Sequence, residues 1–154
     1  MITGAEGASA FGSLIESDRL ELVVDRHARS GMRESMRITA RSYLNAMRIR
    51  KLVQEAFRRL FEHVDILVTY SLPWAPTPID RLFTTVPISG GLTAMVAASN
   101  LAGLPALFLP VGLTADNLPV GIQLVAPPFQ ESRLLSVGMA LQSTTEWHRL
   151  RPPA

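Results

Sequence analysis

The side chains that could act as nucleophiles, general bases or metal ligands are dispersed along this chain. The three histidines, His27, His63 and His148, fall at the ends of predicted helices, and none has a second ligand at the spacing of a metal site. The sequence contains no cysteine, which excludes disulfides and thiolate ligands. The histidines are therefore predicted to cap helices or to face solvent, and we expect neither a metal nor a cofactor.

Two further patterns typical of active sites are incomplete here. The segment PISGGLTA at 87–94 has paired glycines, as a phosphate-binding loop does, but such a loop also needs a lysine after its last glycine, and the only lysine is Lys51. No serine lies in the Gly-x-Ser-x-Gly turn of many serine hydrolases. The residues by themselves therefore mark no catalytic group.

Hydrophobic periodicity predicts that the first third of the chain is helical. Apolar residues recur at three- and four-residue steps from 40 to 63, which indicates a long amphipathic helix with Lys51 on its exposed stripe. Four shorter helices are predicted, at 4–15, 17–31, 90–103 and 131–144.

Two of these helices carry specific expectations. Ser17 is predicted to be the N-cap of the helix at 17–31, and Gly31 is predicted to end it. In the helix at 131–144, four apolar residues are expected to face the core: Leu134, Leu135, Val137 and Leu141. Trp147, which follows this helix, is expected to pack back on the core.

The remaining apolar runs predict buried strands at 64–70, 106–113 and 119–127. The turn at 114–117 is so short that the last two strands should be antiparallel. Pro110 cannot donate a hydrogen bond to a neighbouring strand, so it is expected at a sheet edge or a bulge. The proline-rich segment 71–89 reads as a long ordered loop or a lid.

Composition limits the classes of function. The 154 residues are 47% hydrophobic and only 18% charged, which indicates either a well-buried α/β domain or a surface normally covered by something else. The net charge is +2, and the basic residues alternate with acidic ones on helices, so a nucleic-acid partner is not expected. The first ten residues lack the pattern of a secretion signal, and no apolar run could span a bilayer. We therefore expect a cytoplasmic chain without a membrane partner.

The carboxy-terminal half carries several motifs of one known family. It reads SNLAGLPALFLPVGL and then NLPVGIQLVAPPFQESRLLSVGMALQSTTEWHRLRP, and it strongly resembles the carboxy-terminal part of the amidase signature family. The structural motif positions are Asn100, Gly103, Pro105, Gly121 and Gln123. The upstream segments AEGASAF, ITARSYLNAMRIRKLV and VDILVTYSLPWAPTPI are similar to earlier family segments in the same order, so the resemblance covers nearly the whole chain.

This resemblance implies an α/β fold, specifically part of an α/β/α sandwich around a mixed sheet. Residues 1–154 would then be the carboxy-terminal part of an amidase signature domain. Within it, residues 1–63 would be helical, and residues 64–154 would supply strands and helices that complete the sheet and the substrate funnel.

The resemblance also implies hydrolysis of carboxamides by a Lys–Ser–Ser triad, in which one serine attacks and a second passes its proton toward a neutral lysine. In the family, these groups lie in the amino-terminal half of a chain about three times as long. Here no two serines are adjacent, Lys51 is predicted on an exposed helix face, and Met1 directly precedes the first matching helix. We therefore expect this chain to hold no catalytic residue and to be inactive alone.

By motif position, the resemblance places Thr93 and Ala97 at the acyl pocket and the loop around Trp74 near its wall, although all three could instead be packing residues. In glutamine-dependent tRNA amidotransferase subunits, the position of Thr93 holds an aspartate that anchors the amine of glutamine. Threonine cannot pair with a cation in this way, so a general amidase fits better.

Three hypotheses follow for the function. The leading one is a carboxy-terminal portion of an amidase, arising from a truncated chain, a split gene or a misassigned start, whose partner is the amino-terminal half. The second is a stand-alone interaction module that forms a homodimer through exposed sheet edges. The third, an arginine-rich nucleic-acid binder, is disfavoured by the alternation of acids and bases.

Overall fold

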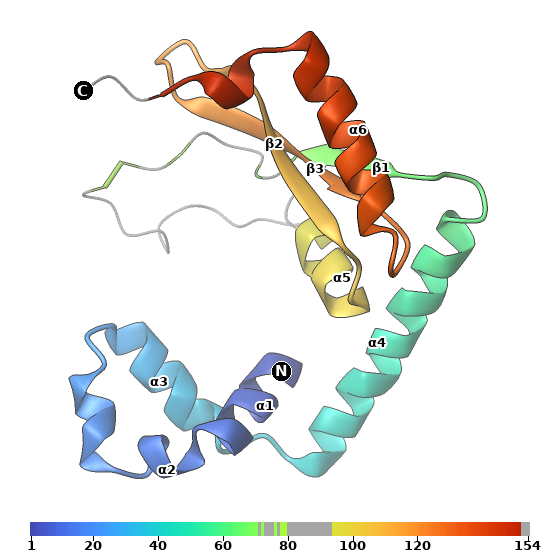
Figure 1. Cartoon of the computed structure of the whole chain (residues 1–154). Coiled ribbons are helices and arrows are strands. Elements are labelled where there is room, and N and C mark those ends of the chain that lie inside the picture. Colours follow the sequence, from blue (N-terminus) through green and yellow to red (C-terminus); the bar gives the residue numbers. More distant parts are fainter. Residues whose placement is uncertain (71, 73–75, 77, 80–93, 152–154) are drawn as a thin grey trace. The chain divides into compact units, whose positions relative to one another are not determined.

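A computed structural model describes residues 1–70, 72, 76, 78–79 and 94–151 of the chain. The chain divides into two compact units, Met1–Leu52 and Val53–Ala154, and the boundary lies inside the longest helix. Figure 1 shows the elements in chain order. In the part of the chain that the structure describes, no helix has the length and apolar character needed to cross a membrane.

The first unit is helical. Its helices and turns are α1 (Ile2–Ala10), α2 (Gly12–Ile15), η1 (Asp18–Leu22), α3 (Arg26–Ser35) and the first half of α4 (Ala40–Leu60). A 3-10 turn therefore replaces the beginning of the helix that the sequence predicts at 17–31. Ser17 caps this turn, accepting a hydrogen bond from the Arg19 amide.

The helix α3 begins later than predicted because Asp25 is its N-cap. The Asp25 carboxylate accepts hydrogen bonds from the amides of His27 (2.8 Å) and Ala28 (3.2 Å). Gly31 lies inside α3 and does not end it, so that prediction is wrong. An isolated glycine is tolerated in a helix interior when the cap and the flanking residues favour the helix.

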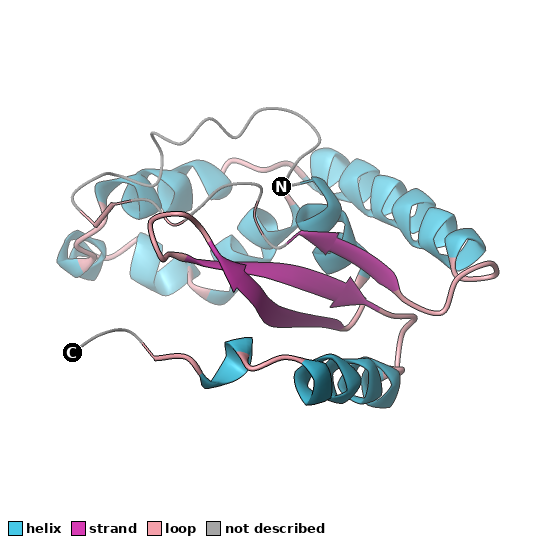
Figure 2. Ribbon diagram, turned by 90° about the horizontal axis from the view of Figure 1, so that it is seen from above, coloured by secondary structure: helices cyan, strands magenta, loops and turns pink. Residues whose placement is uncertain are grey.

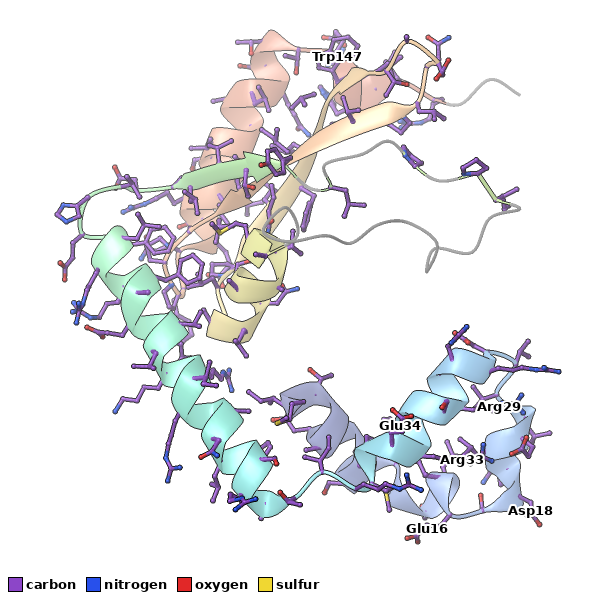
Figure 3. The ribbon with its side chains drawn as sticks, turned by 180° about the vertical axis from the view of Figure 1, so that it is seen from behind. Glu16, Asp18, Arg29, Arg33, Glu34 and Trp147 are labelled. Carbon is purple, nitrogen blue, oxygen red and sulfur yellow. The ribbon has the colours of Figure 1, made fainter. Side chains whose placement is uncertain are left out.

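An ion-pair cluster ties η1 to α3. Arg29 and Arg33, both labelled in Figure 3, project from α3 and pair with the carboxylate of Glu21 on η1. The hydrogen bond from Arg33 is the main cause that lowers the pKa of Glu21. Because Glu21 and Arg33 are exposed, the cluster contributes little stability, but it joins η1 to α3.

The second unit contains the sheet. Its elements are the end of α4, β1 (Leu67–Tyr70), α5 (Ala94–Ala102), β2 (Ala106–Leu113), β3 (Pro119–Val125), α6 (Glu131–Thr144) and η3 (Trp147–Arg149). The predicted helices at 40–63 and 131–144 are confirmed as α4 and α6, and a strand lies in each of the three predicted segments. The strand β2 has the predicted bounds, whereas β1 and β3 are shorter. The predicted burial is wrong for β1, because Val68 and Tyr70 are exposed. The part of the predicted helix 90–103 that precedes α5 lies outside the described residues, as does most of the segment 71–89.

The strand order is β1-β3-β2, and β3 pairs antiparallel with both neighbours. The predicted antiparallel arrangement of β2 and β3 is confirmed. Pro110 lies on the edge strand β2, next to a bulge between Pro110 and Gly112, as expected for a residue without an N–H group. The resemblance implied a mixed sheet, but all pairs among the described strands are antiparallel, because β1 and β2 both run opposite to the central strand.

Helices cover both faces of this sheet, which confirms the α/β/α layering within the second unit. Figure 2 shows α6 and η3 on one side of the sheet, and α5 lies on the other. The core under α6 consists of Leu109, Leu124, Ala126 and Leu134. Gly138 allows α6 to approach closely, since a Cβ atom there would lie 2.7 Å from Cδ2 of Leu107.

The inward face of α6 is narrower than the sequence indicates. Leu134 and Gly138 are buried and Leu141 is half-buried, which is one stripe at four- and three-residue steps. Leu135 and Val137 lie on the flanks of this stripe and are exposed, so their predicted inward positions are wrong. Trp147 lies in η3, which packs against β2, and remains partly exposed.

Candidate functional site

A buried chain of hydrogen bonds joins α5 to the central strand β3. The side chain of Gln123 is completely buried, and its Nε2 donates to Oγ of Ser99 at 3.3 Å. Ser99 is itself buried and donates to the carbonyl oxygen of Val96 at 3.1 Å. The amide of Gln123 therefore fixes the position of α5 on the sheet.

The side-chain oxygen of Gln123 is unusual. Within the described part of the chain, Oε1 of Gln123 is a buried acceptor without a hydrogen-bond partner. A buried polar atom without a partner lowers stability by about 1–3 kcal/mol, so such atoms are rare in folded proteins. Nδ1 of His148 is similarly buried and unpaired among the described residues, and the side chain is half-buried, so the predicted surface or capping position of this histidine is wrong.

The motif residues after Ser99 end α5 and start β2. Gly103 has φ 77°, a left-handed conformation that glycine adopts most readily, and its amide donates to the carbonyl groups of Ser99 (3.0 Å) and Asn100 (3.1 Å). Two residues later, the Pro105 carbonyl accepts a hydrogen bond from the amide of Ala126 at 3.2 Å. Gly121 lies opposite Pro110 in the register of β3 and β2.

The structure describes only one of the three predicted pocket residues. Ala97 lies on the exposed side of α5, on the face opposite Ser99. Trp74 and Thr93 lie outside the described residues, so the structure does not bring the three together. Their role at an acyl pocket stays a prediction, and a pocket built on Ala97 would lie on the side of α5 that faces away from the sheet.

An apolar groove of about 410 Å³ lies between the end of α4, the end of α5 and the loop after β3. Its walls include Phe57 and Phe61, whose rings stack with centroids 6.2 Å apart, together with Ala102 and the prolines 127 and 128. The side chain of Gln54 donates to the Ala102 carbonyl at 3.1 Å and ties the two helices together. Sequence reasoning missed this groove, because its residues come from three separate segments.

The groove contains a charge, but that charge is neutralised. Arg58 lies on its wall and makes ion pairs with Glu55 (2.9 Å) and Glu62 (2.5 Å). Hydrogen bonds from Arg58 and then Arg59 lower the pKa of Glu55 to about 2. Since the cation already has two carboxylate partners, the groove is an apolar surface and not an anion site.

No catalytic constellation is present in the described residues. They contain no group of three or more His, Cys, Asp or Glu side chains that could hold a metal ion. Lys51 is exposed on α4, as the sequence predicts. The buried hydroxyl of Ser99 is engaged with Gln123 and Val96, so it has no base to activate it.

The link between Gln123 and Ser99 is testable by a double-mutant cycle. We expect Gln123→Leu and Ser99→Ala to show a coupling energy of about 0.5–1.5 kcal/mol in urea unfolding, the usual value of one neutral hydrogen bond. Gln123→Leu alone should lower the free energy of unfolding by less than Ser99→Ala does, because leucine also removes the unpaired Oε1. A coupling energy of zero would contradict the hydrogen-bonded link between α5 and β3.

The chain matches known proteins over most of its length. The Amidase family pattern matches residues 3–135. Curated relatives include a glutamyl-tRNA(Gln) amidotransferase subunit of Synechococcus sp. (strain JA-2-3B'a(2-13)), which is 44% identical over 113 residues, or 72% of this chain and 21% of the relative. The corresponding subunit of Acinetobacter baumannii (strain AYE) is 39% identical over 109 residues, covering 71% of this chain and 22% of the relative.

Solved structures share the fold at lower identity. A 6-aminohexanoate cyclic dimer hydrolase matches with a TM-score of 0.74 and 22% identity over 98% of this chain and 34% of that chain. A protein from a vestigial complex related to the evolution of an s-triazine catabolic enzyme matches with a TM-score of 0.78 and 24% identity. The match covers 92% of this chain and 32% of that chain. The chain thus spans about a fifth of the curated relatives and a third of these structures.

Three observations indicate the same family: the sequence motifs, the α/β/α layering of the second unit and the match over residues 3–135. This chain belongs to the Amidase family, the amidase signature family that its motifs resemble.

Proposed function

We propose that this chain is the carboxy-terminal portion of an amidase that hydrolyses carboxamides to a carboxylate and ammonia or an amine. The single observation that carries this proposal is the family match over residues 3–135, combined with coverage of only a third of the structures that share the fold. The proposal assigns the chemistry to the assembled protein and a supporting role to this chain. The comparisons give no support to the alternative of a stand-alone interaction module.

The requirements of amide hydrolysis determine which groups this chain supplies and which the remainder of the protein supplies. A hydroxyl attacks an amide only when a base removes its proton, and backbone amides must then stabilise the oxyanion. The Lys–Ser–Ser groups implied by the family would come from the remainder of the protein. This chain would supply three strands of the sheet, the helix α5 held by Gln123, and the predicted pocket residues Trp74, Thr93 and Ala97.

Complementation tests this function. The chain would be co-expressed with an amino-terminal portion, such as the Synechococcus relative without its matched 113 residues. We expect the pair to release ammonia from simple carboxamides with saturation kinetics, while that portion alone does not. A stable complex that leaves every carboxamide unchanged would contradict the proposed activity.

A second candidate function is favoured by the curated relatives. The Synechococcus and Acinetobacter proteins are glutamyl-tRNA(Gln) amidotransferase subunits, so the second candidate is a portion of such a subunit. The family resemblance implies an aspartate at the position of Thr93 in such subunits, so the threonine of this chain favours a general amidase. The same complemented pair decides between them, because a general amidase should prefer simple carboxamides and the amidotransferase subunit should prefer glutamine.

A further inference from the structure

The first half of α4 carries basic residues that no acidic residue accompanies. Residues 35–54 contain four arginines and one lysine, but no aspartate or glutamate. The alternation of acidic and basic residues on the helices is therefore interrupted over this segment. A helix with one sign of charge is typical of a surface that binds a partner of the opposite charge.

These basic side chains are exposed, and their charges are not compensated. Arg37, Arg41 and Lys51 are exposed, and none of them pairs with a carboxylate in the described part of the chain. Arg48 is exposed as well, and its guanidinium donates only to a neutral amide side chain one turn away. By contrast, the two arginines near the end of α4 both pair with Glu55.

The unpaired bases of α4 lie on one side of the helix. Arg41 and Arg48 lie about two turns apart in nearly the same direction, and Lys51 follows on the flank of that side. Tyr43, whose hydroxyl contacts the carboxylate of Glu6 on α1 at 3.5 Å, lies on the opposite side of α4. The bases therefore face away from the contact between α4 and α1.

Exposed apolar side chains lie among these bases. Leu44, Ile49 and Leu52 are 54%, 58% and 70% exposed, and helical geometry places them on the same outward half of α4. The basic and apolar residues together form a surface that belongs entirely to the first unit. We call this surface the α4 face; it consists of Arg41, Leu44, Arg48, Ile49, Lys51 and Leu52.

The composition of the α4 face distinguishes between three kinds of anionic partner. Nucleic acids are bound mainly through their phosphates, which require bases but not exposed aliphatic side chains. A helix that lies on an anionic bilayer separates a broad apolar face from its basic residues, whereas Leu44 lies between Lys51 and Arg48 around α4. An acidic amphipathic helix presents carboxylates and apolar side chains on one surface, so it matches both components of the α4 face.

We propose that the α4 face binds an acidic amphipathic helix of a partner protein. The carboxylates of that helix pair with Arg41, Arg48 and Lys51, and its apolar side chains cover Leu44 and Leu52. Charge complementarity with a segment that has no acidic residue of its own determines the choice of partner. The inference goes beyond amide hydrolysis and does not depend on it.

Binding of a defined peptide tests this proposal. The probe is a fluorescently labelled helical peptide of about 20 residues, made of alanine and glutamate with leucine at three- and four-residue steps. We expect the full chain to bind it saturably, and Arg41→Glu/Arg48→Glu to weaken binding by about tenfold or more, because like charges would then meet. Added salt should weaken binding by the wild-type chain.

A matched control and a second variant separate the α4 face from net charge and from folding. Arg19→Glu/Arg26→Glu changes the net charge equally, at two exposed arginines of η1 and α3 without an ion pair among the described residues, so it should retain wild-type affinity. Leu52→Ser, at a side chain that is 70% exposed, should weaken binding by about threefold or more without any change of charge. Thermal unfolding of each variant should match the wild type, and if the α4 double variant unfolds, Leu52→Ser decides alone.

Several outcomes would overturn the proposal. They include no saturable binding of the peptide, equal loss with the control variant, and equal binding of a peptide with lysine in place of glutamate. Binding of duplex DNA or of anionic vesicles without binding of the peptide would assign the bases to phosphates. Binding that disappears when the chain is in complex with the Synechococcus relative lacking its matched 113 residues would show that the same protein covers this surface. An inactive complex that still binds the peptide would contradict only the proposed amidase activity.

Discussion

Purified alone and incubated with simple carboxamides, the chain is expected to release ammonia no faster than the buffer does. Amide hydrolysis by the covalent route that the family resemblance implies needs a hydroxyl or thiol whose proton a nearby base can accept. The chain has no cysteine, its only lysine is exposed on α4, and the buried Ser99 is engaged in hydrogen bonds. The expected effect is therefore the complete loss of a rate enhancement that in enzymes commonly exceeds about a millionfold.

The measurement is a coupled ammonia assay over a range of amide concentrations. Ser99→Ala serves as a matched control, because a residual rate that persists in this variant cannot come from the buried hydroxyl. Saturable release by the wild-type chain, retained through further purification, would show that it has a nucleophile and a base of its own.

Leu134→Ala is expected to lower the free energy of unfolding by about 2–5 kcal/mol, whereas Leu135→Ala should change it by less than about 0.5 kcal/mol. The two leucines are neighbours on α6, but Leu134 is 3% exposed in the core cluster and Leu135 is 57% exposed. The first substitution leaves a cavity between α6 and the sheet. The second removes a side chain that is already in water.

Urea unfolding followed by tryptophan fluorescence measures both values, since both tryptophans belong to the unit that contains α6. The comparison is controlled internally, because residue type, helix and position along the helix are matched. Similar losses for the two variants would mean that α6 buries a wider face than the structure shows.

The elements most accurately predicted from sequence are those with a long or unambiguous pattern. The helix α4 repeats its apolar positions over more than five turns, so local errors average out. The antiparallel pairing of β2 and β3 follows from a connection too short for any other arrangement. Pro110 could be assigned to an edge or bulge from its missing N–H group alone.

The errors arise where a second local signal or a tertiary contact overrides the pattern that was read. Gly31 looks like a helix stop, but the capping interactions of Asp25 start α3 close enough to carry the helix past it. Leu135 and Val137 look like core residues, but a helix on a three-stranded sheet touches it along one stripe only. The sequence shows which side chains of a helix are apolar. How many of them are buried depends on the width of the sheet surface against which the helix packs.

The sequence predicted the backbone motifs of the candidate site but not the contacts between its side chains. Asn100, Gly103 and Pro105 form a recognisable helix ending, whereas the unpaired Oε1 of Gln123 depends on where α5 lies over β3. The apolar groove beside Phe57 combines segments about 70 residues apart, which no local pattern reports. Trp74 and Thr93 lie outside the described residues, so their assignment still depends on the family resemblance.

The closed edge of β2 limits how copies of this chain can aggregate. Amyloid-like growth requires every added copy to present a fresh edge for the next one. With Pro110 and the adjacent bulge on one side, two copies that met through β1 would leave no further edge, so they would stop as a pair. The edge of β1 alone can therefore join two copies but cannot seed a fibril.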